Sequence, residues 1–332
     1  MSSSQELSTF IWQIADLLRG PYRPPQYERV MLPMTVLRRF DCVLNGLAKQ
    51  AVVDEYERLR KSGASDDVID RKLNKLAGYR FHNHSPLTFE RLKGDPDRIA
   101  QHLGSYIAGF SQNVRDIFDK FDFMKEVEKM DEANLLYLVV SSFADVDLHH
   151  DKVDNAMMGT LFEDLIRRFN EQANETAGDH FTPRDVVELM VDLLLAPDDD
   201  VLQTEGIIKT VFDPTCGTGG LLSEVRNQVE DMNESATLFL YGQDFNPRSY
   251  AIAASDFLMK EDHSARPKAE IQFGDTLTND QFEGKTFDYF LANPPFGVDW
   301  KRQRDEVKRE HEKEGFAGRF GAGLPRVNDG AL

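Results

Sequence analysis

The sequence predicts a helical N-terminal domain over residues 1–170 and an α/β domain with a parallel sheet over residues 171–332. Two observations lead to this prediction. Apolar residues recur at helical spacing through the first half of the chain, whereas short apolar strands alternate with helices after residue 180. Such alternation is typical of a parallel sheet with helices on its faces. A length of 332 residues accommodates two domains of this kind.

Helical periodicity defines the predicted elements of the N-terminal domain. Phe10, Ile11, Ile14, Leu17 and Leu18 recur at helical spacing in a first helix, and a second apolar pattern follows between Val36 and Leu47. A turn rich in Gly and Pro separates the two helices. Further helices are predicted near residues 51–62, 66–77, 95–108, 111–119, 132–143 and 154–170.

A polar run at residues 171–180 marks the predicted domain boundary. Directly after it, Thr182 is predicted as the N-cap of a helix, with Pro183 in the first turn and Asp185 as the capping partner. This helix is expected to end near Leu195. Strands are then predicted near residues 208–213, 237–243, 269–274 and 286–291, with helices at 219–231 and 246–259.

Composition excludes several classes of protein. Hydrophobic residues make up 41% of the chain and charged residues 29%, which excludes a largely disordered chain or a collagen-like repeat. No apolar run reaches the roughly 20 residues of a membrane span. The N-terminus lacks the pattern of a signal peptide, and Cys42 and Cys216 do not form a disulfide framework. We therefore expect a cytoplasmic protein without a membrane partner.

The net charge of −18 is unusual for a protein that binds nucleic acid unaided, because neutralising phosphates requires Lys and Arg. The charge is distributed unevenly. Residues 1–80 carry 13 basic and 10 acidic residues, whereas the remainder carries 26 and 47. If the substrate is DNA or RNA, we expect some contacts from the N-terminal part and many from a partner.

A glycine-rich loop follows the first predicted strand. Glycines let the backbone approach a ligand closely, and the helix after the loop presents unpaired N–H groups. The loop lacks the Lys-Ser/Thr pair of a phosphate-binding P-loop, and a plain strand–helix turn is the alternative. Its candidate residues are Asp213, Pro214, Gly217, Thr218, Gly219 and Gly220.

Two further acidic residues follow the next two predicted strands. Asp244 ends the second strand, where an acidic residue commonly binds the two hydroxyls of a ribose. Asp275 follows the third strand and could accept a hydrogen bond from an adenine amino group. The alternatives are a solvated strand-end carboxylate at Asp244 and an ordinary Gly-Asp turn at Asp275.

The fourth predicted strand leads into Asn293, Pro294, Pro295 and Phe296. An amino group on an aromatic ring or a carbonyl is a poor nucleophile because its lone pair is delocalised. The side-chain oxygen of Asn293 and a backbone carbonyl near Pro294 could accept its two N–H bonds, which favours a pyramidal nitrogen that can attack. Phe296 offers a ring face on which an extruded base could stack.

Asp-Pro-Thr-Cys-Gly-Thr-Gly-Gly at 213–220, followed by Asn-Pro-Pro-Phe at 293–296, resembles the amino-methyltransferases that use S-adenosylmethionine. Gly-Asp-His-Phe-Thr-Pro-Arg at 178–184 is similar to a segment in modification subunits of type I restriction–modification systems. The segments at 32–44 and 159–166 resemble the helical domain of the same subunits. The resemblance covers nearly all of the chain from about residue 8, and it implies a Rossmann-like class I methyltransferase domain.

This resemblance implies methylation of DNA adenine at N6, with S-adenosyl-L-methionine as the donor. Residues 213–220 would shape the cofactor pocket, Asp244 would bind the ribose, and Asp275 the adenine edge. Asn293, Pro294, Pro295 and Phe296 would form the target-base site. The methionine end of the cofactor would be held by Asp179, His180, Phe181, Thr182, Pro183 and Arg184.

No metal is expected at this site, because a sulfonium is already an activated methyl donor. His149, His150, Asp151 and Asp154 lack a fixed ligand spacing, and we interpret them as a polar loop. Cys216 is interpreted as a small packed residue rather than a reactive thiol.

The resemblance also implies partners. In such subunits a separate specificity subunit reads the DNA sequence, and a second modification subunit and a restriction subunit belong to the same complexes. The resemblance leaves open whether a nuclease accompanies this chain. The family's remaining strands do not follow residue 332, so we expect a fragment in which the strand at 287–291 has an unpaired edge.

Two alternative functions remain at this stage. One is methylation of another planar nitrogen, such as cytosine N4, RNA adenine or a protein glutamine amide, since the same Asn-Pro-Pro-aromatic chemistry serves all of them. The other is a non-catalytic assembly scaffold. Methyl-transfer assays on DNA, RNA and protein distinguish the first alternative from DNA adenine methylation. Cofactor titration tests the second, because a scaffold needs no cofactor binding.

Overall fold

The computed structural model describes residues 4–173, 182–260, 269–294, 299–324 and 326–327. The chain divides into two compact units. The first comprises residues 1–175 and 254–266, and the second comprises residues 176–253 and 267–332. The division near residue 175 lies five residues after the predicted one, and the sequence did not predict that residues 254–266 would join the first unit.

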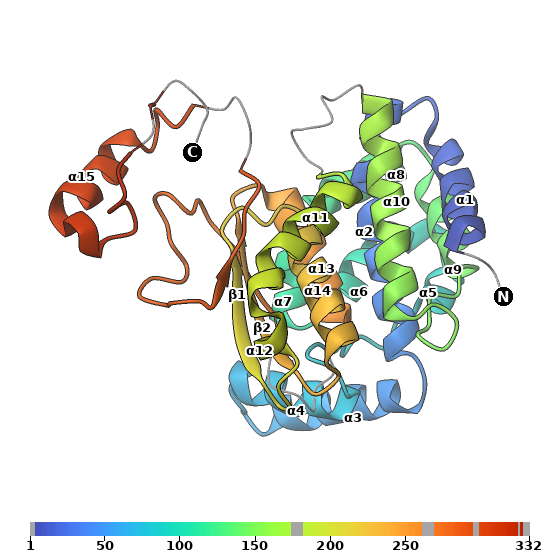
Figure 1. The fold of residues 1–332 in the computed structure, drawn as a ribbon. Coiled ribbons are helices and arrows are strands. Elements are labelled where there is room, and N and C mark those ends of the chain that lie inside the picture. Colours follow the sequence, from blue (N-terminus) through green and yellow to red (C-terminus); the bar gives the residue numbers. More distant parts are fainter. Residues whose placement is uncertain (1–3, 174–181, 261–268, 295–298, 325, 328–332) are drawn as a thin grey trace. The chain divides into compact units, whose positions relative to one another are not determined.

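The first unit is helical (Figure 1). The structure adds α5 and α8 to the predicted helices. The helices are α1 (Ser4–Ala15), α2 (Glu28–Leu44), α3 (Leu47–Lys61), α4 (Asp66–Ala77), α5 (Phe89–Leu92), α6 (Ile99–Ala108), α7 (Gln112–Lys120), α8 (Phe123–Glu132), α9 (Leu136–Ala144) and α10 (Asn155–Ala173).

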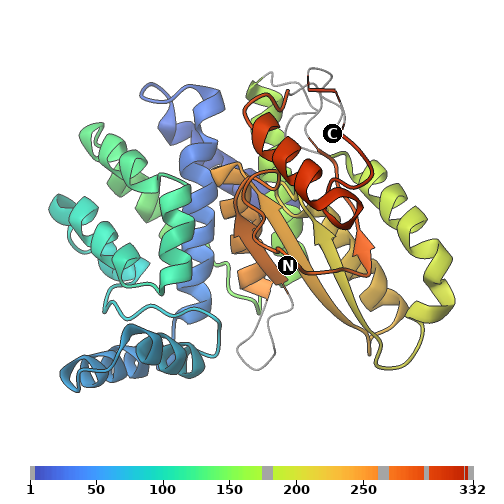
Figure 2. The ribbon, with the colours of Figure 1, turned by 90° about the vertical axis from the view of Figure 1, so that its left-hand side faces the viewer.

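Helix α2 is the centre of this unit, and Figure 2 shows it as a long blue helix beside the cyan and green ones. Nearly every side chain from Val30 to Leu44 is buried, including charged ones. The Arg38 guanidinium donates to the Val146 carbonyl at 2.7 Å and to Asp41 Oδ2 at 2.7 Å. Buried charge is tolerated when it is fully hydrogen-bonded, so these contacts allow α2 to carry Arg38 into the core.

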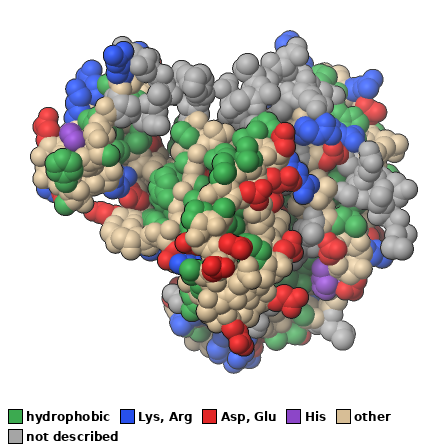
Figure 3. Space-filling view, viewed as in Figure 1, with side chains coloured by type: hydrophobic (Ala, Val, Ile, Leu, Met, Phe, Trp, Pro, Cys, Tyr) green, Lys and Arg blue, Asp and Glu red, His purple; other side chains and the backbone are tan. Residues whose placement is uncertain are grey.

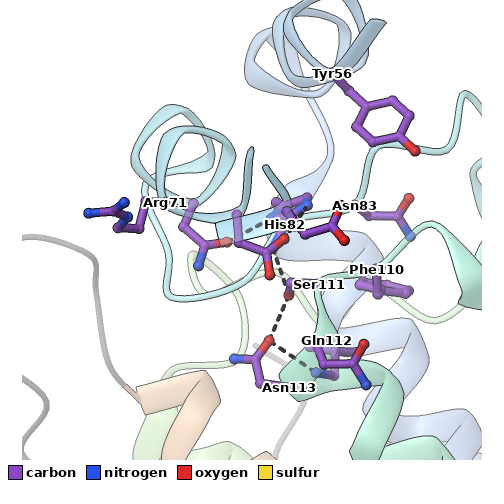
Figure 4. Close-up of polar contacts among 12 residues, drawn as sticks. Tyr56, Arg71, His82, Asn83, Phe110, Ser111, Gln112 and Asn113 are labelled. Atoms are coloured by element: carbon purple, nitrogen blue, oxygen red, sulfur yellow. Dashed lines mark hydrogen bonds and ion pairs between the residues drawn. The ribbon is translucent and has the colours of Figure 1, made fainter. Parts of the chain in front are cut away.

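A buried polar cluster around His82 connects the segment between α4 and α5 with the start of α7 (Figure 4). The backbone N–H and C=O of His82 both pair with Ser111, and the Ser111 hydroxyl donates to Asn113 Oδ1 at 2.7 Å. Nδ1 of His82 donates to Asn74 Oδ1 at 2.7 Å. Burial lowers the pKa of His82 to about 3 and that of the neighbouring His84 to about 4. Both rings are therefore neutral at physiological pH.

The second unit is built on a parallel four-stranded sheet in the order β3-β2-β1-β4. Its strands are β1 (Ile208–Asp213), β2 (Thr237–Asp244), β3 (Ala269–Phe273) and β4 (Tyr289–Phe290). Its helices are α11 (Arg184–Leu195), α12 (Asp199–Leu202), α13 (Gly220–Met232), the first part of α14 (Pro247–Lys260) and α15 (Arg304–Glu314).

The two faces of this sheet are covered differently. Helices α11 and α13 lie on one face (Figure 1). On the other face, the ring of Phe212 lies 4.6 Å from that of Phe287 and 5.4 Å from that of Phe282. Phe290 packs edge-on against Phe212 and is 60% exposed, on the outer strand of the described sheet.

Helix α11 also leaves apolar side chains exposed. Val186, Leu189 and Leu193 recur at helical spacing and are 42%, 57% and 67% exposed. Figure 3 shows apolar side chains gathered over this helix. Its buried residues, such as Val187 and Val191, face the opposite way.

In the second unit, three elements differ from the sequence prediction. β4 has two residues where six were expected, and neither α12 nor α15 was predicted. α15 is highly charged and buries only Val307, so hydrophobic periodicity gives no signal for it. None of the helices in the described ranges is long and apolar enough to cross a bilayer.

The neutral histidines predict a pH-dependent stability. The unfolded chain binds a proton at His82 near pH 6.5, whereas the folded chain binds it only near pH 3, so folding loses stability as the pH falls through this window. Between about pH 6.5 and about pH 5 the loss is about 2 kcal/mol for this one side chain. We expect the difference in unfolding free energy between wild type and His82→Gln to shrink by that amount, measured by urea unfolding.

The control for this experiment is Ser142→Ala, because Ser142 lies in the same unit and has no titratable group; its hydroxyl only donates to the Leu138 carbonyl. Its difference from wild type should stay constant with pH. A difference for His82→Gln that is equally constant would contradict the assignment of a neutral buried imidazole.

Candidate active site

The candidate residues follow the carboxyl ends of four parallel strands. Asp213 ends β1, Asp244 ends β2, Asp275 follows β3 by two residues and Asn293 follows β4 by three. Parallel strands bring such loops to a single edge of the sheet, which is where open α/β sheets bind ligands.

The glycine loop runs from Asp213 into α13 at Gly220. Gly217 and Gly219 have φ values of +54° and +86°, in the left-handed region that favours glycine. The Thr215 N–H donates to Asp213 Oδ1 at 3.0 Å, and the Gly217 N–H donates to Asp244 Oδ2 at 2.8 Å. The loop is therefore held by both of the carboxylates that flank it.

Asp213 is the most buried of the candidate carboxylates. Its side chain is fully enclosed, and Oδ2 has no hydrogen-bond partner among the described residues. Burial, reinforced by the nearby Asp244, raises the pKa of Asp213 to about 7. A buried acceptor without a donor is costly, so this oxygen is suited to a donor or a positive charge from a ligand.

Asp244 is also buried, with 8% exposure. Besides Gly217, the N–H of Asn246 donates to its carboxylate, to Oδ1 at 2.7 Å. The Asp244 carbonyl accepts from the Gly274 N–H at 3.0 Å, which connects the ends of β2 and β3. These contacts orient the carboxylate at the end of its strand.

Asp275 is held by two donors. Oδ1 accepts from the Leu277 N–H at 3.0 Å, and Oδ2 accepts from Gln303 Nε2 at 2.7 Å. The sequence offered no signal for Gln303, because it lies outside the recognised motifs and contacts Asp275 only through the tertiary fold. The nearby Thr276 hydroxyl donates to the Pro214 carbonyl of the glycine loop.

The structure brings Thr182 and Asn293 together, although 111 residues separate them. Nδ2 of Asn293 donates to Thr182 Oγ1 at 2.8 Å. The amide group is thereby oriented, with its nitrogen toward Thr182 and its oxygen available as an acceptor. This contact unites a residue from the predicted cofactor segment with one from the predicted target-base motif.

The predicted capping role of Thr182 is wrong. Helix α11 begins at Arg184 with Pro183 as its N-cap, and no side chain caps it. Pro183 is extended, with φ −55° and ψ 141°, so the helix starts one residue later than a Thr182 cap requires. The Thr182 hydroxyl bonds to Asn293 instead. Arg184 is exposed and pairs with Glu188 at 3.0 Å.

Some candidate residues lie outside the described ranges. They are Asp179, His180, Phe181, Pro295 and Phe296. Pro294 is described and is half-buried.

Cys216 lies buried in the glycine loop, with 5% exposure. Burial raises the pKa of the Cys216 thiol well above its usual range, which disfavours the reactive thiolate.

The ligand atoms of His149, His150 and Asp151 lie within 4.8 Å of one another in an exposed loop of the first unit. Asp151 pairs with both imidazoles, at 3.2 Å each.

The donor and acceptor pattern of the edge fits S-adenosylmethionine. That molecule carries an ammonium group, two ribose hydroxyls, an adenine amino group and a positive sulfonium. Asp213, Asp244 and Asp275 supply carboxylate acceptors at the ends of three neighbouring strands, and one acceptor, Asp213 Oδ2, lacks a described donor. The left-handed glycines allow the backbone to approach such a ligand.

Family models and curated relatives both connect this chain with methylases. A family model described as N-6 DNA Methylase matches residues 153–322, and one described as HsdM N-terminal domain matches residues 7–143. A type I restriction enzyme methylase subunit (MjaIX) of Methanocaldococcus jannaschii is 25% identical over 320 residues, or 90% of this chain and 52% of the relative. The EcoEI methylase subunit of Escherichia coli is 24% identical over 209 residues, or 60% of this chain and 40% of the relative.

The fold is also shared with a solved structure. The crystal structure of a type I restriction-modification system methyltransferase subunit from Streptococcus thermophilus matches with a TM-score of 0.66 and 21% identity, over 99% of this chain and 70% of that one. The chain spans about half the length of the Methanocaldococcus relative. Because the first of the two family models covers more than half of its residues, the chain belongs to the N-6 DNA Methylase family.

Proposed function

We propose that this chain is the modification subunit of a type I restriction–modification system, and that it transfers a methyl group from S-adenosylmethionine to N6 of an adenine in DNA. The contact that carries the proposal is the hydrogen bond from Asn293 to Thr182. It sets the Asn293 amide at the sheet edge that also bears three carboxylates. Family membership favours adenine N6 in DNA over the other planar nitrogens.

Asn293 acts on the amino group that is methylated. Because its Nδ2 donates to Thr182, its Oδ1 accepts an N–H bond of the target amine. A backbone carbonyl near Pro294 accepts the second N–H bond. Drawing both hydrogens toward acceptors localises the nitrogen lone pair, so the amine can attack a methyl carbon. When bound, S-adenosylmethionine would supply that carbon in activated form: the C–S bond would break, S-adenosylhomocysteine would leave as a neutral thioether, and the methylated nitrogen would lose one proton to solvent.

The cofactor is held at the ends of β1, β2 and β3. Asp244 accepts hydrogen bonds from the ribose hydroxyls, and Asp275 accepts one from the adenine amino group. The segment from Asp179 to Arg184 holds the methionine end, and the loop from Asp213 to Gly220 encloses it. A bound cation stabilises the ionised form of Asp213, whose pKa burial raises to about 7.

The partners follow from charge and family. A chain of net charge −18 neutralises few phosphates by itself, so a specificity subunit supplies the base reading and much of the DNA contact. A second modification subunit completes the methyltransferase, and a restriction subunit joins complexes that also cleave DNA. We infer a cytoplasmic location, because host DNA is the substrate.

Two alternatives are tested with the same preparation. Methyl transfer to RNA, to cytosine N4 or to a protein glutamine, without transfer to DNA adenine, would replace the proposed substrate. A chain that binds no S-adenosylmethionine by calorimetry would be a scaffold rather than an enzyme.

We expect Asn293→Ala to lower the rate of methyl transfer by about 100-fold or more, because a positioned acceptor for the reacting amine is lost. Affinity for S-adenosylmethionine should stay nearly constant, since Asn293 contacts the amine and not the cofactor. The measurement is single-turnover transfer of labelled methyl to a duplex in the presence of the specificity subunit.

Thr182→Val provides the matched comparison for Asn293. It keeps the shape of the side chain and removes the hydroxyl that orients the amide. Its rate should fall between those of wild type and Asn293→Ala. Wild-type rates in both variants would refute the assigned role of this pair.

We expect Asp244→Ala to weaken binding of S-adenosylmethionine by about 1.5–3 kcal/mol, the scale of hydrogen bonds to a charged group. The measurement is isothermal calorimetry. Asp231→Ala is the control, because Asp231 is an exposed carboxylate on α13 of the same unit. An Asp244 variant with wild-type affinity would place the ribose elsewhere.

We expect the isolated chain to bind duplex DNA poorly at physiological salt and to gain affinity when the specificity subunit is added. The reason is the excess of carboxylates outside residues 1–80. Fluorescence anisotropy with a labelled duplex measures both states. Tight, sequence-specific binding by the isolated chain would overturn the proposed division of labour.

A further inference from the structure

The segment at residues 299–324, here called the brace, contacts the wall of the candidate cofactor site. It contains α15 and the glycine-rich turn after it, within the second unit. Trp300 and Val307 are each 2% exposed, so the brace is packed at its start and in its helix. None of its residues belongs to the motifs that the sequence singled out.

Three consecutive residues of the site wall receive donors from the brace. Gln303 Nε2 donates to Asp275 Oδ2 at 2.7 Å. The Arg319 guanidinium donates to the Thr276 carbonyl at 2.5 Å and to the Leu277 carbonyl at 3.3 Å. Gln303 therefore holds the Asp275 carboxylate, and Arg319 holds the backbone of the two residues that follow Asp275.

Arg319 is itself fixed within the brace. It forms a two-point contact with Glu310 of α15, with distances of 2.6 and 2.8 Å, and lies 3.5 Å from Asp280. His311 Nδ1 donates to the Phe320 carbonyl at 2.8 Å, which closes the turn onto the helix. A Cβ at Gly321 would lie 2.9 Å from the Phe316 backbone, so the turn requires glycine there.

The contacted wall is connected to the rest of the site. Thr276, whose carbonyl accepts from Arg319, also donates its hydroxyl to the Pro214 carbonyl of the glycine loop. Gly274, one residue before Asp275, donates to the Asp244 carbonyl. A displacement of residues 275–277 therefore changes contacts of both neighbouring loops.

We propose that Gln303 and Arg319 are positioning residues for the cofactor's adenine, and that they act by fixing the carboxylate of Asp275. The inference rests on the proposed function, in which Asp275 receives the adenine amino group.

The argument for positioning follows from the chemistry of the carboxylate. Two oxygens offer about four acceptor sites. The Leu277 N–H occupies one site on Oδ1 and Gln303 occupies one on Oδ2, so the carboxylate is prevented from rotating and still has acceptor sites for a ligand. A pre-oriented acceptor binds its donor more tightly because less freedom is lost on binding.

The test compares two ligands by calorimetry on the purified chain. One is S-adenosylhomocysteine, and the other is its analogue with hydrogen in place of the purine 6-amino group. Gln303→Ala should weaken binding of the first by roughly 3- to 10-fold, the scale of one net hydrogen bond. It should leave affinity for the analogue unchanged, because the analogue lacks the group that Asp275 receives. Arg319→Lys should show the same selective loss, since lysine cannot span both carbonyls.

The matched control is Arg304→Ala, because Arg304 lies in the brace and pairs with its neighbour Asp305 at 2.9 Å. It should bind both ligands as wild type does. Equal weakening of both ligands in the Gln303 variant would show a merely structural role, and unchanged affinity for both would show no role; either result overturns the inference. A wild-type chain that binds neither ligand would instead contradict the proposed function.

Discussion

All four described strands run parallel, so the loops that follow them leave from one edge of the sheet. The candidate site depends on this constraint. The register that pairs Asp213 with Gly242 sets the end of β1 beside β2 and brings two carboxylates to the glycine loop. An antiparallel neighbour would have sent one of them to the opposite edge.

Hydrogen bonds between loops connect the parts of this edge, in addition to the local bonds within each loop. Asp244 accepts from the glycine loop, Thr276 donates to that loop, and Asn293 donates to Thr182. Each contact joins residues that are distant in sequence. Under the proposed function, the bond from Asn293 to Thr182 would let the predicted cofactor segment orient the amide of the predicted target-base motif.

The charge distribution of the chain bears on both parts of the proposed function, cofactor binding and DNA recognition. Carboxylates gathered at one edge suit a cationic donor, and burial makes Asp213 sensitive to any positive charge nearby. The same acidic balance repels DNA phosphates over most of the chain. The proposed methyl transfer and DNA recognition therefore place opposite demands on charge, which is why we propose a separate specificity subunit for the second.

The sequence by itself determined the helical first unit and the bounds of β1, because these depend on local periodicity and on turn chemistry. The roles of the candidate residues stay predictions. The sequence could not determine helix α15 or Gln303, since a charged helix has no apolar period and its contact with Asp275 exists only after folding. Local reasoning also assigned Thr182 to a helix cap. The tertiary structure decided otherwise, because a side chain 111 residues away reaches its hydroxyl.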